Sequence, residues 1–200
     1  MTSSEYRPRL TSLANLLGVL RIALTPVVIV LLLLPFPGGG LLAFVIFGVA
    51  GFTDYLDGRV ARARGQVSPF GVFMDLTADK VLVAGVLVAM VEASLLPTWI
   101  VATILIRELV IQGVRQLAAS ADVVIAARAL GKAKTLTTLV AMALLLLAFD
   151  ARTGGPMSTL HAGAALSAAG FWLMVVATVL TLVSAWDYVR GALPILMGER

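Results

Sequence analysis

Six long apolar runs constrain this chain more than any other feature of its sequence. The candidate helices that contain them cover approximately residues 13–34, 41–63, 70–93, 97–119, 129–149 and 166–189. A helix needs about 20 predominantly apolar residues to cross the hydrocarbon core of a bilayer. The mean hydropathy of +1.02 and a charged fraction of 13% agree with a chain that faces lipid. We therefore predict an all-α, polytopic membrane protein, folded as a bundle of six transmembrane helices.

The connections between these runs are short, and no repeat, low-complexity tract or linker divides the chain. Six spans leave no room for a sizeable soluble domain within 200 residues. We therefore expect residues 1–200 to form a single membrane domain, with residues 1–12 as a cytoplasmic or interfacial N-terminal segment. The first apolar run is longer than the core of a signal peptide and lacks a small-residue cleavage signature, so we interpret it as a permanent span.

Lysine and arginine are distributed unequally between the two sides of the predicted bundle. The connections on one side contain Arg152, whereas the other side, with both termini, receives Arg7, Arg9, Arg62, Arg64, Arg115, Arg128, Lys132, Lys134, Arg190 and Arg200. Basic residues favour the cytoplasmic side and attract anionic lipid, so we expect both termini to be cytoplasmic and no nucleic-acid partner. Glu92 and Asp150 lie at helix ends on the far side, where we expect both to be solvated.

Four aspartates interrupt the apolar pattern, in the stretch DYLDGRVARARGQVSPFGVFMDLTADK. Asp54 and Asp57 are three residues apart on the second predicted helix, so they occupy one helical face. Asp75 and Asp79 are four apart on the third and do the same. A short cytoplasmic loop joins the two helices and places both pairs at a similar depth, about 15 Å from that loop at 1.5 Å per residue. The four carboxylates are therefore expected to converge inside the bundle.

Such a cluster of carboxylates favours a hard divalent cation. Like charges in a partly desolvated site repel one another unless cations compensate them. Oxygen ligands suit Mg²⁺ or Mn²⁺, whereas a zinc site is not expected because the chain has no cysteine and a single, distant histidine. Two such ions would clamp a transferring phosphoryl group. Salt bridges or a solvated crevice are alternative explanations for the cluster.

The same stretch resembles the complete signature of the CDP-alcohol phosphotransferases, in the order Asp54-x2-Asp57-Gly58-x2-Ala61-Arg62-x8-Gly71-x3-Asp75-x3-Asp79. The resemblance implies a six-helix membrane fold that is usually a homodimer. It also implies two divalent ions, bound by the first three aspartates, and a fourth aspartate, Asp79, that both helps to bind metal and acts as general base.

A binding site for CDP-diacylglycerol follows from the same resemblance, which places Gly58, Arg62 and Ser68 against the CDP moiety. The small residue Gly71 allows close approach of a backbone or ligand. Asn15 and Arg21 lie inside the first span, where polar side chains are costly unless they serve a site or a partner. We favour a role for Asn15 at the nucleotide and for Arg21 near phosphate over hydrogen bonding between helices.

Basic residues concentrate at the cytoplasmic ends of the fourth and fifth predicted helices, where an anionic acceptor would be attracted. The residues expected to bind the acceptor's phosphate are Arg21, Arg107, Arg115, Arg128, Lys132 and Lys134. Two alternatives stay open. Arg107 can pair with Glu108 or another carboxylate to hold the bundle. Lys132 and Lys134 can serve as anchors on the cytoplasmic side.

Three segments, ANLLGVLR, IRELVIQGVR and GKAKT, are also similar to the bacterial phosphatidylglycerophosphate synthases of that family. This resemblance implies transfer of a phosphatidyl group from CDP-diacylglycerol to glycerol 3-phosphate, at the cytoplasmic face of the bacterial inner membrane. Ala14, Gly18 and Thr138 replace the usual proline, threonine and glutamine. Inositol phosphate, or phosphatidylglycerol as in a cardiolipin synthase, therefore stays open as the acceptor. An ion-coupled transporter that uses the carboxylates as a relay is an alternative of a different class.

Overall fold

The computed structural model describes residues 13–64, 69–120 and 129–196, with side chains at 16–53, 77–120, 131–186 and 188–190. Within these ranges the chain forms six α-helices and one short 3-10 helix. They are α1 (Leu13–Leu33), α2 (Gly39–Arg64), α3 (Pro69–Glu92), α4 (Thr98–Ser120), α5 (Ala129–Arg152), η1 (Pro156–Leu160) and α6 (Gly163–Leu196). The all-α class and the six helices are confirmed, with most ends within three residues of the prediction. The sequence did not predict η1.

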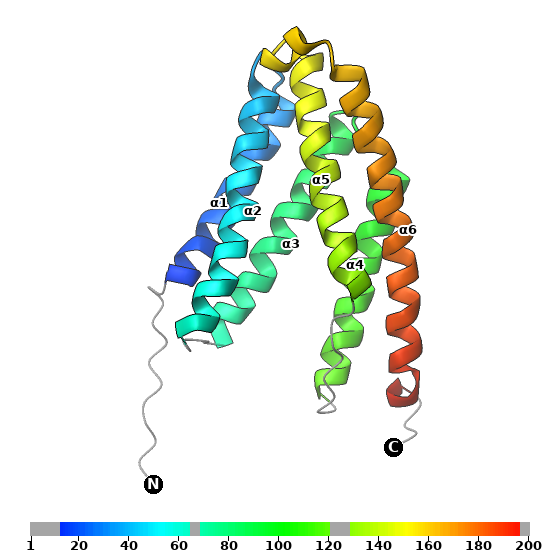
Figure 1. Cartoon of the computed structure of the whole chain (residues 1–200). Helices are drawn as coiled ribbons and strands as arrows, with labels where there is room; N and C mark the ends of the chain where they lie inside the picture. The colour runs from blue at the N-terminus through cyan, green and yellow to red at the C-terminus, as the bar shows by residue number, and fades with distance from the viewer. Residues whose placement is uncertain (1–12, 65–68, 121–128, 197–200) are drawn as a thin grey trace.

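The helices alternate in direction and form two groups, α1–α3 and α4–α6 (Figure 1). In the first group α1 packs against α3 and α2, and in the second α6 packs along α5 and against α4. Contacts between α2 and α5 join the groups. The groups meet at the end of the bundle that carries η1, called here the η1 end, and separate toward the opposite end, where α1 begins and α6 ends (Figure 1).

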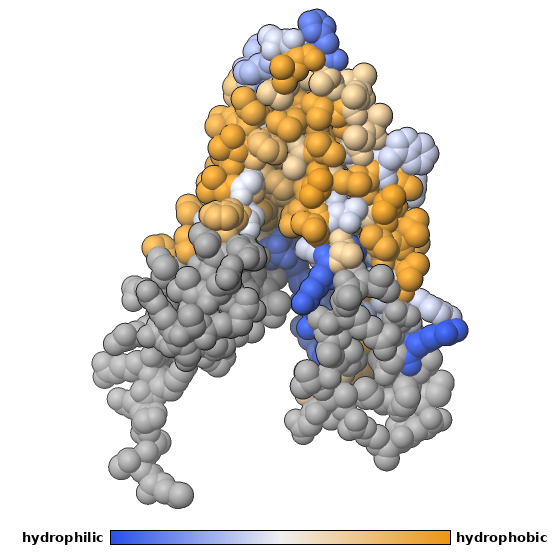
Figure 2. All heavy atoms as spheres, viewed as in Figure 1, coloured by the Kyte–Doolittle hydropathy of each residue, from blue (hydrophilic) through white to orange (hydrophobic). Residues whose placement is uncertain are grey.

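In the described part of the chain, apolar side chains lie on the exterior of the bundle as well as in its core. Buried side chains such as Phe47, Leu87 and Met142 fill the core, while Ile106 is 62% exposed and Trp172 65% exposed. Figure 2 shows apolar residues over most of the described face, with hydrophilic ones at the η1 end and in the hollow between the two groups. A continuous apolar exterior is unfavourable in water and favourable in lipid.

Three helical stretches in the described part are long and apolar enough to cross a membrane, namely Leu16–Leu33, Gly131–Arg152 and Gly163–Arg190. The apolar stretch of α2, Gly39–Thr53, is shorter. The helix α4 carries Arg107, Glu108 and Arg115 within its length, which lowers its hydropathy. These three helices support the prediction of a membrane protein. The full set of six spans remains a proposal.

Asp150 is not solvated, contrary to the sequence prediction, but completely buried. Its Oδ1 accepts the backbone N–H of Leu41 at 3.0 Å, and its Oδ2 accepts that of Met157 at 2.9 Å. These two N–H groups lie in the first turns of α2 and η1. Backbone N–H groups in the first turn of a helix have no hydrogen-bond acceptor within that helix. A β-carbon at Gly40 would lie 2.7 Å from the Cα of Asp150, so the glycine allows α2 to approach α5. Glu92 is exposed, as predicted.

Replacing Asp150 with asparagine is expected to lower the free energy of unfolding by about 1–3 kcal/mol, because asparagine offers one carbonyl oxygen for two buried N–H donors. Denaturant titration in detergent measures the change. Glu92→Gln, an exposed carboxylate at the same end of the bundle, serves as control and should leave the stability unchanged. Equal stability of the two variants would contradict this structural role of Asp150.

Candidate active site

The signature aspartates lie on the adjoining ends of α2 and α3. Asp54 and Asp57 are on the part of α2 that leads to its last residue, Arg64, and Asp75 and Asp79 are in the first half of α3. The backbone thus places both pairs in the halves of α2 and α3 that lie away from η1. The predicted residues whose side chains lie outside the described part are Asn15, Asp54, Asp57, Arg62, Ser68, Asp75 and Arg128. Gly58 and Gly71 lie on the helical backbone of α2 and α3.

Asp79 is the signature aspartate whose side chain is described, and it lines a cavity of about 270 Å³ between α3, α4 and α5. Val83, Ile104 and Leu139 form apolar parts of the wall, and polar groups contribute at a few positions, including Lys80, Glu108, Gln112, Lys134 and Thr138. A largely apolar cavity with a few placed polar groups is typical of a small-molecule site. Thr138, which replaces the glutamine usual in the resembling synthases, is among the residues that line this cavity.

Four of the predicted acceptor-binding residues line a second cavity, of about 480 Å³, between α4, α5 and α6. These residues are Arg107, Arg115, Lys132 and Lys134. The two cavities share Glu108, Lys134, Thr135 and Leu139 in their walls. A basic cavity therefore adjoins the cavity that Asp79 lines, and whether these residues bind an acceptor stays a prediction.

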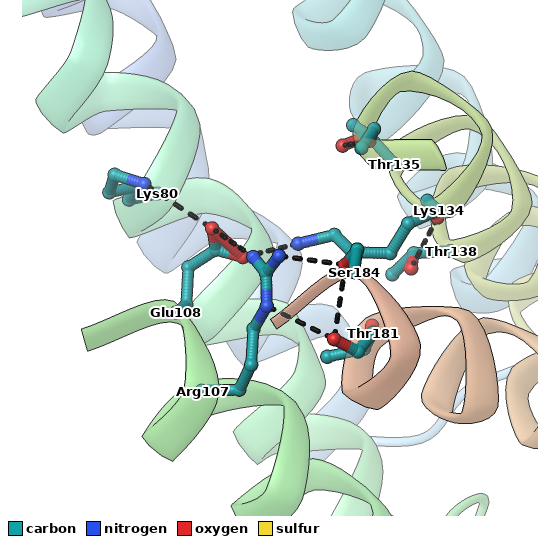
Figure 3. A network of polar contacts seen from close by, with 9 residues as sticks. Lys80, Arg107, Glu108, Lys134, Thr135, Thr138, Thr181 and Ser184 are labelled. Carbon is teal, nitrogen blue, oxygen red and sulfur yellow. Dashed lines mark hydrogen bonds and ion pairs between the residues drawn. The ribbon is translucent and has the colours of Figure 1, made fainter. Parts of the chain in front are cut away.

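Glu108 is the centre of an ion-pair network at the shared wall (Figure 3). Lys134 Nζ donates a hydrogen bond to its Oε2. The other carboxylate oxygen, Glu108 Oε1, lies 3.4 Å from Arg107 Nη1 and 3.7 Å from Lys80 Nζ. These side chains come from α3, α4 and α5, so one carboxylate links both helix groups. Sequence reasoning named Glu108 only as a partner for Arg107, although a carboxylate inside an apolar run was the available signal.

Arg107 is 8% exposed and holds α4 against α6. Its Nη2 donates to Ser184 Oγ at 2.8 Å, and its Nε donates to the carbonyl oxygen of Thr181 at 3.2 Å (Figure 3). Together with the contact to Glu108, these bonds show the bundle-holding arrangement that the sequence left open as an alternative. A direct role in binding the acceptor stays a prediction for Arg107.

Arg21 is 1% exposed on α1 and lies outside the walls of both cavities. Thr25, one turn later, faces Gly85 of α3, where a β-carbon would lie 2.9 Å from Thr25 Cγ2. The two helices run in the same direction (Figure 1). At 1.5 Å per residue, this register places the backbones of Arg21 and Asp79 within roughly 3 Å of the same level along the bundle. Arg21 therefore sits at the depth of the site, and its predicted role near phosphate rests on the sequence.

The family model for CDP-alcohol phosphatidyltransferase matches residues 11–183, which include every residue that lines the two cavities except Tyr188 of α6. The chain belongs to the CDP-alcohol phosphatidyltransferase family. The signature resemblance is thereby confirmed at the level of the family.

Curated relatives in this family extend over most of the chain. A CDP-diacylglycerol–glycerol-3-phosphate 3-phosphatidyltransferase of Bacillus subtilis is 35% identical, over 88% of this chain and 93% of its own length. A probable phosphatidylglycerophosphate synthase of Mycobacterium tuberculosis is 36% identical, over 97% of this chain and 88% of its own length. A CDP-diacylglycerol–glycerol-3-phosphate 3-phosphatidyltransferase of Cereibacter sphaeroides is 31% identical, over 94% of this chain and 99% of its own length.

The donor atoms available in this CDP-alcohol phosphatidyltransferase fit a hard divalent cation. The candidate ligands Asp54, Asp57, Asp75 and Asp79 supply carboxylate oxygens from two neighbouring helices. The single histidine, His161, follows η1 at the opposite end of the bundle, and the chain has no cysteine. Oxygen-only ligands favour Mg²⁺ or Mn²⁺ over Zn²⁺.

Proposed function

We propose that this protein transfers the phosphatidyl group of CDP-diacylglycerol to sn-glycerol 3-phosphate, giving phosphatidylglycerophosphate and CMP. The observation that carries the proposal is the basic cavity beside the cavity lined by Asp79. An acceptor with a hydroxyl and a phosphate group needs a carboxylate that accepts a proton and, close by, cations that bind the phosphate. The names of two of the relatives describe a transfer between the same two substrates.

In the proposed reaction, Asp79 accepts the proton of the acceptor's 1-hydroxyl, and the resulting oxygen attacks the lipid-bearing β-phosphorus. A new phosphorus–oxygen bond forms there as the bond from the β-phosphorus to the CMP oxygen breaks. The acceptor's phosphate is held by Arg115, Lys132, Lys134 and the residues near them. This contact keeps the acceptor's hydroxyl oriented toward Asp79. Two Mg²⁺ or Mn²⁺ ions, held by the four signature aspartates, would neutralise charge on the diphosphate and on the departing CMP.

The donor is assigned to the end of α2 and the start of α3. Asn15, Gly58, Arg62, Ser68 and Gly71 bind CDP-diacylglycerol in this proposal, with Arg62 clamping a phosphate oxygen. Glycine at positions 58 and 71 permits close approach of the ligand. The lipid chains stay in the inner leaflet.

We further propose that residues 1–200 form one membrane domain with α1–α6 as six spans and both termini in the cytoplasm. The basic residues Arg115, Lys132 and Lys134 lie on helices at the end opposite Arg152, as the positive-inside rule requires for an active site that faces the cytoplasm. The protein is assigned to the bacterial inner membrane, and the family resemblance supports a homodimer.

Detergent-solubilised protein is expected to release CMP from CDP-diacylglycerol when glycerol 3-phosphate and Mg²⁺ or Mn²⁺ are present. In parallel reactions, inositol phosphate or phosphatidylglycerol replaces glycerol 3-phosphate as the acceptor. Transfer to either alcohol would depend on the same four aspartates. A transporter would instead need a gradient across sealed vesicles and release no CMP in detergent. Absence of CMP with every alcohol and every metal would rule out the transferase.

A further inference from the structure

Glu108 occupies a position from which it can set the geometry of the whole site. It lines both cavities and contacts Lys80 from α3, Arg107 from its own helix and Lys134 from α5. Lys134 is 7% exposed, while the Glu108 side chain is 31% exposed toward the cavities. The carboxylate therefore orients a buried ammonium group at the wall that the two cavities share.

The network also crosses the separation between the two helix groups. Lys80 directly follows Asp79 on α3, and α3 makes its main contacts with α1 rather than with α4. The links from Lys80 to Glu108 and from Glu108 to Lys134 join the helix of Asp79 to the helix of the basic residues (Figure 3). Glu108 therefore bridges Lys80, the neighbour of Asp79 in the chain, and Lys134.

We propose that Glu108 is a positioning residue for the acceptor, an inference that rests on the proposed function. Glu108 holds the Lys134 ammonium group where it meets the acceptor's phosphate while the hydroxyl faces Asp79. A lysine side chain has a flexible four-carbon stem, so a fixed partner is needed to keep its charge in one place. Small displacements of such groups have large effects on reaction rates and binding. Glu108 acts through Lys134 and does not itself have to touch the substrate.

A purely electrostatic role for Glu108 predicts the opposite result. Three cations and one carboxylate give the cluster a formal charge of +2. If Glu108 only reduced the positive charge, Glu108→Gln would strengthen the attraction for an anionic acceptor and lower its KM. If Glu108 positions Lys134, the same substitution raises that KM although the cluster becomes more positive. The direction of the change therefore separates the two roles.

The test is steady-state CMP release in detergent by wild type, Glu108→Gln, Glu108→Asp, Lys134→Met and the Glu108→Gln/Lys134→Met double variant. Glu108→Gln is expected to raise the KM for glycerol 3-phosphate about tenfold and to change that for CDP-diacylglycerol less than about twofold. Glu108→Asp, which keeps the charge, should lie between Glu108→Gln and wild type. In the Lys134→Met background, Glu108→Gln should add less than about twofold, since its partner is already absent.

The matched control is Glu92→Gln, the same change at an exposed glutamate at the η1 end, which should behave as wild type. A lower KM for glycerol 3-phosphate, additive effects in the double variant, or equal losses for both substrates would overturn the positioning role. If Glu108→Gln fails to fold in detergent, the same criteria apply to Glu108→Asp, which must then show the selective rise in KM. Wild type that is inactive with every acceptor overturns the proposed function and this inference together, whereas active wild type with additive variants overturns this inference alone.

Discussion

Replacing Asp79 with asparagine is expected to lower the rate of CMP release by about a thousandfold, within the range that general-base catalysis contributes. Asparagine is nearly isosteric but cannot accept the proton of the acceptor's hydroxyl, and its amide is a weaker ligand for a hard cation. Asp79 lines the cavity between α3, α4 and α5, so the substitution acts where the acceptor is proposed to bind. Single-turnover CMP release with saturating glycerol 3-phosphate measures the effect on chemistry apart from substrate binding.

The stability of the Asp79→Asn variant in detergent should match that of wild type, because the side chain keeps its size. Glu92→Gln neutralises a carboxylate at the η1 end of the same helix and is the appropriate control. A correctly folded Asp79→Asn protein that retains activity within about tenfold of wild type would remove Asp79 from the role of general base.

Removal of divalent metal is expected to reduce CMP release to about 1% or less of the initial rate, because the charge on the diphosphate is then left uncompensated. Dialysis against EDTA followed by metal analysis establishes the starting state. Addition of Mg²⁺ or Mn²⁺ should restore activity, since the four candidate ligands supply oxygen atoms only.

Binding of the metal also has a readout that does not depend on turnover. Mg²⁺ or Mn²⁺ should raise the melting temperature of wild type, and the rise should be smaller for Asp54→Asn, because a ligand stabilises the state that binds it. Full activity in protein shown to be free of metal would contradict the assignment of Asp54, Asp57, Asp75 and Asp79 as ligands.

The helices could be predicted from the sequence because hydropathy is a local property. A run of apolar residues ends where proline, glycine and charge begin, as at Pro35–Gly40 and at Pro69, and the helices begin and end near these positions. The sequence also allowed the prediction that one cavity is lined by Arg115, Lys132 and Lys134. These residues lie at the adjoining ends of two consecutive helices.

The contacts within the site depend on how distant helices are rotated against one another, and a single sequence does not give this rotation. Arg107 meets Thr181 and Ser184, which are 74 and 77 positions away along the chain. Asp150 meets Leu41 across 109 positions, so its burial could not be inferred from its place at a helix end. The importance of Glu108 likewise depends on the packing of α3 and α5, which brings Lys80 and Lys134 to it.

Transfer to glycerol 3-phosphate is tested most directly by the lipid product formed in competition. Purified wild type receives CDP-diacylglycerol, Mg²⁺ and equal concentrations of glycerol 3-phosphate, inositol phosphate and phosphatidylglycerol, and the lipids are identified by mass spectrometry. The proposed function predicts phosphatidylglycerophosphate as the main product, formed in equal amount to CMP. Phosphatidylinositol phosphate or cardiolipin as the main product would contradict the proposed acceptor, and CMP without any new phospholipid would contradict the transfer itself.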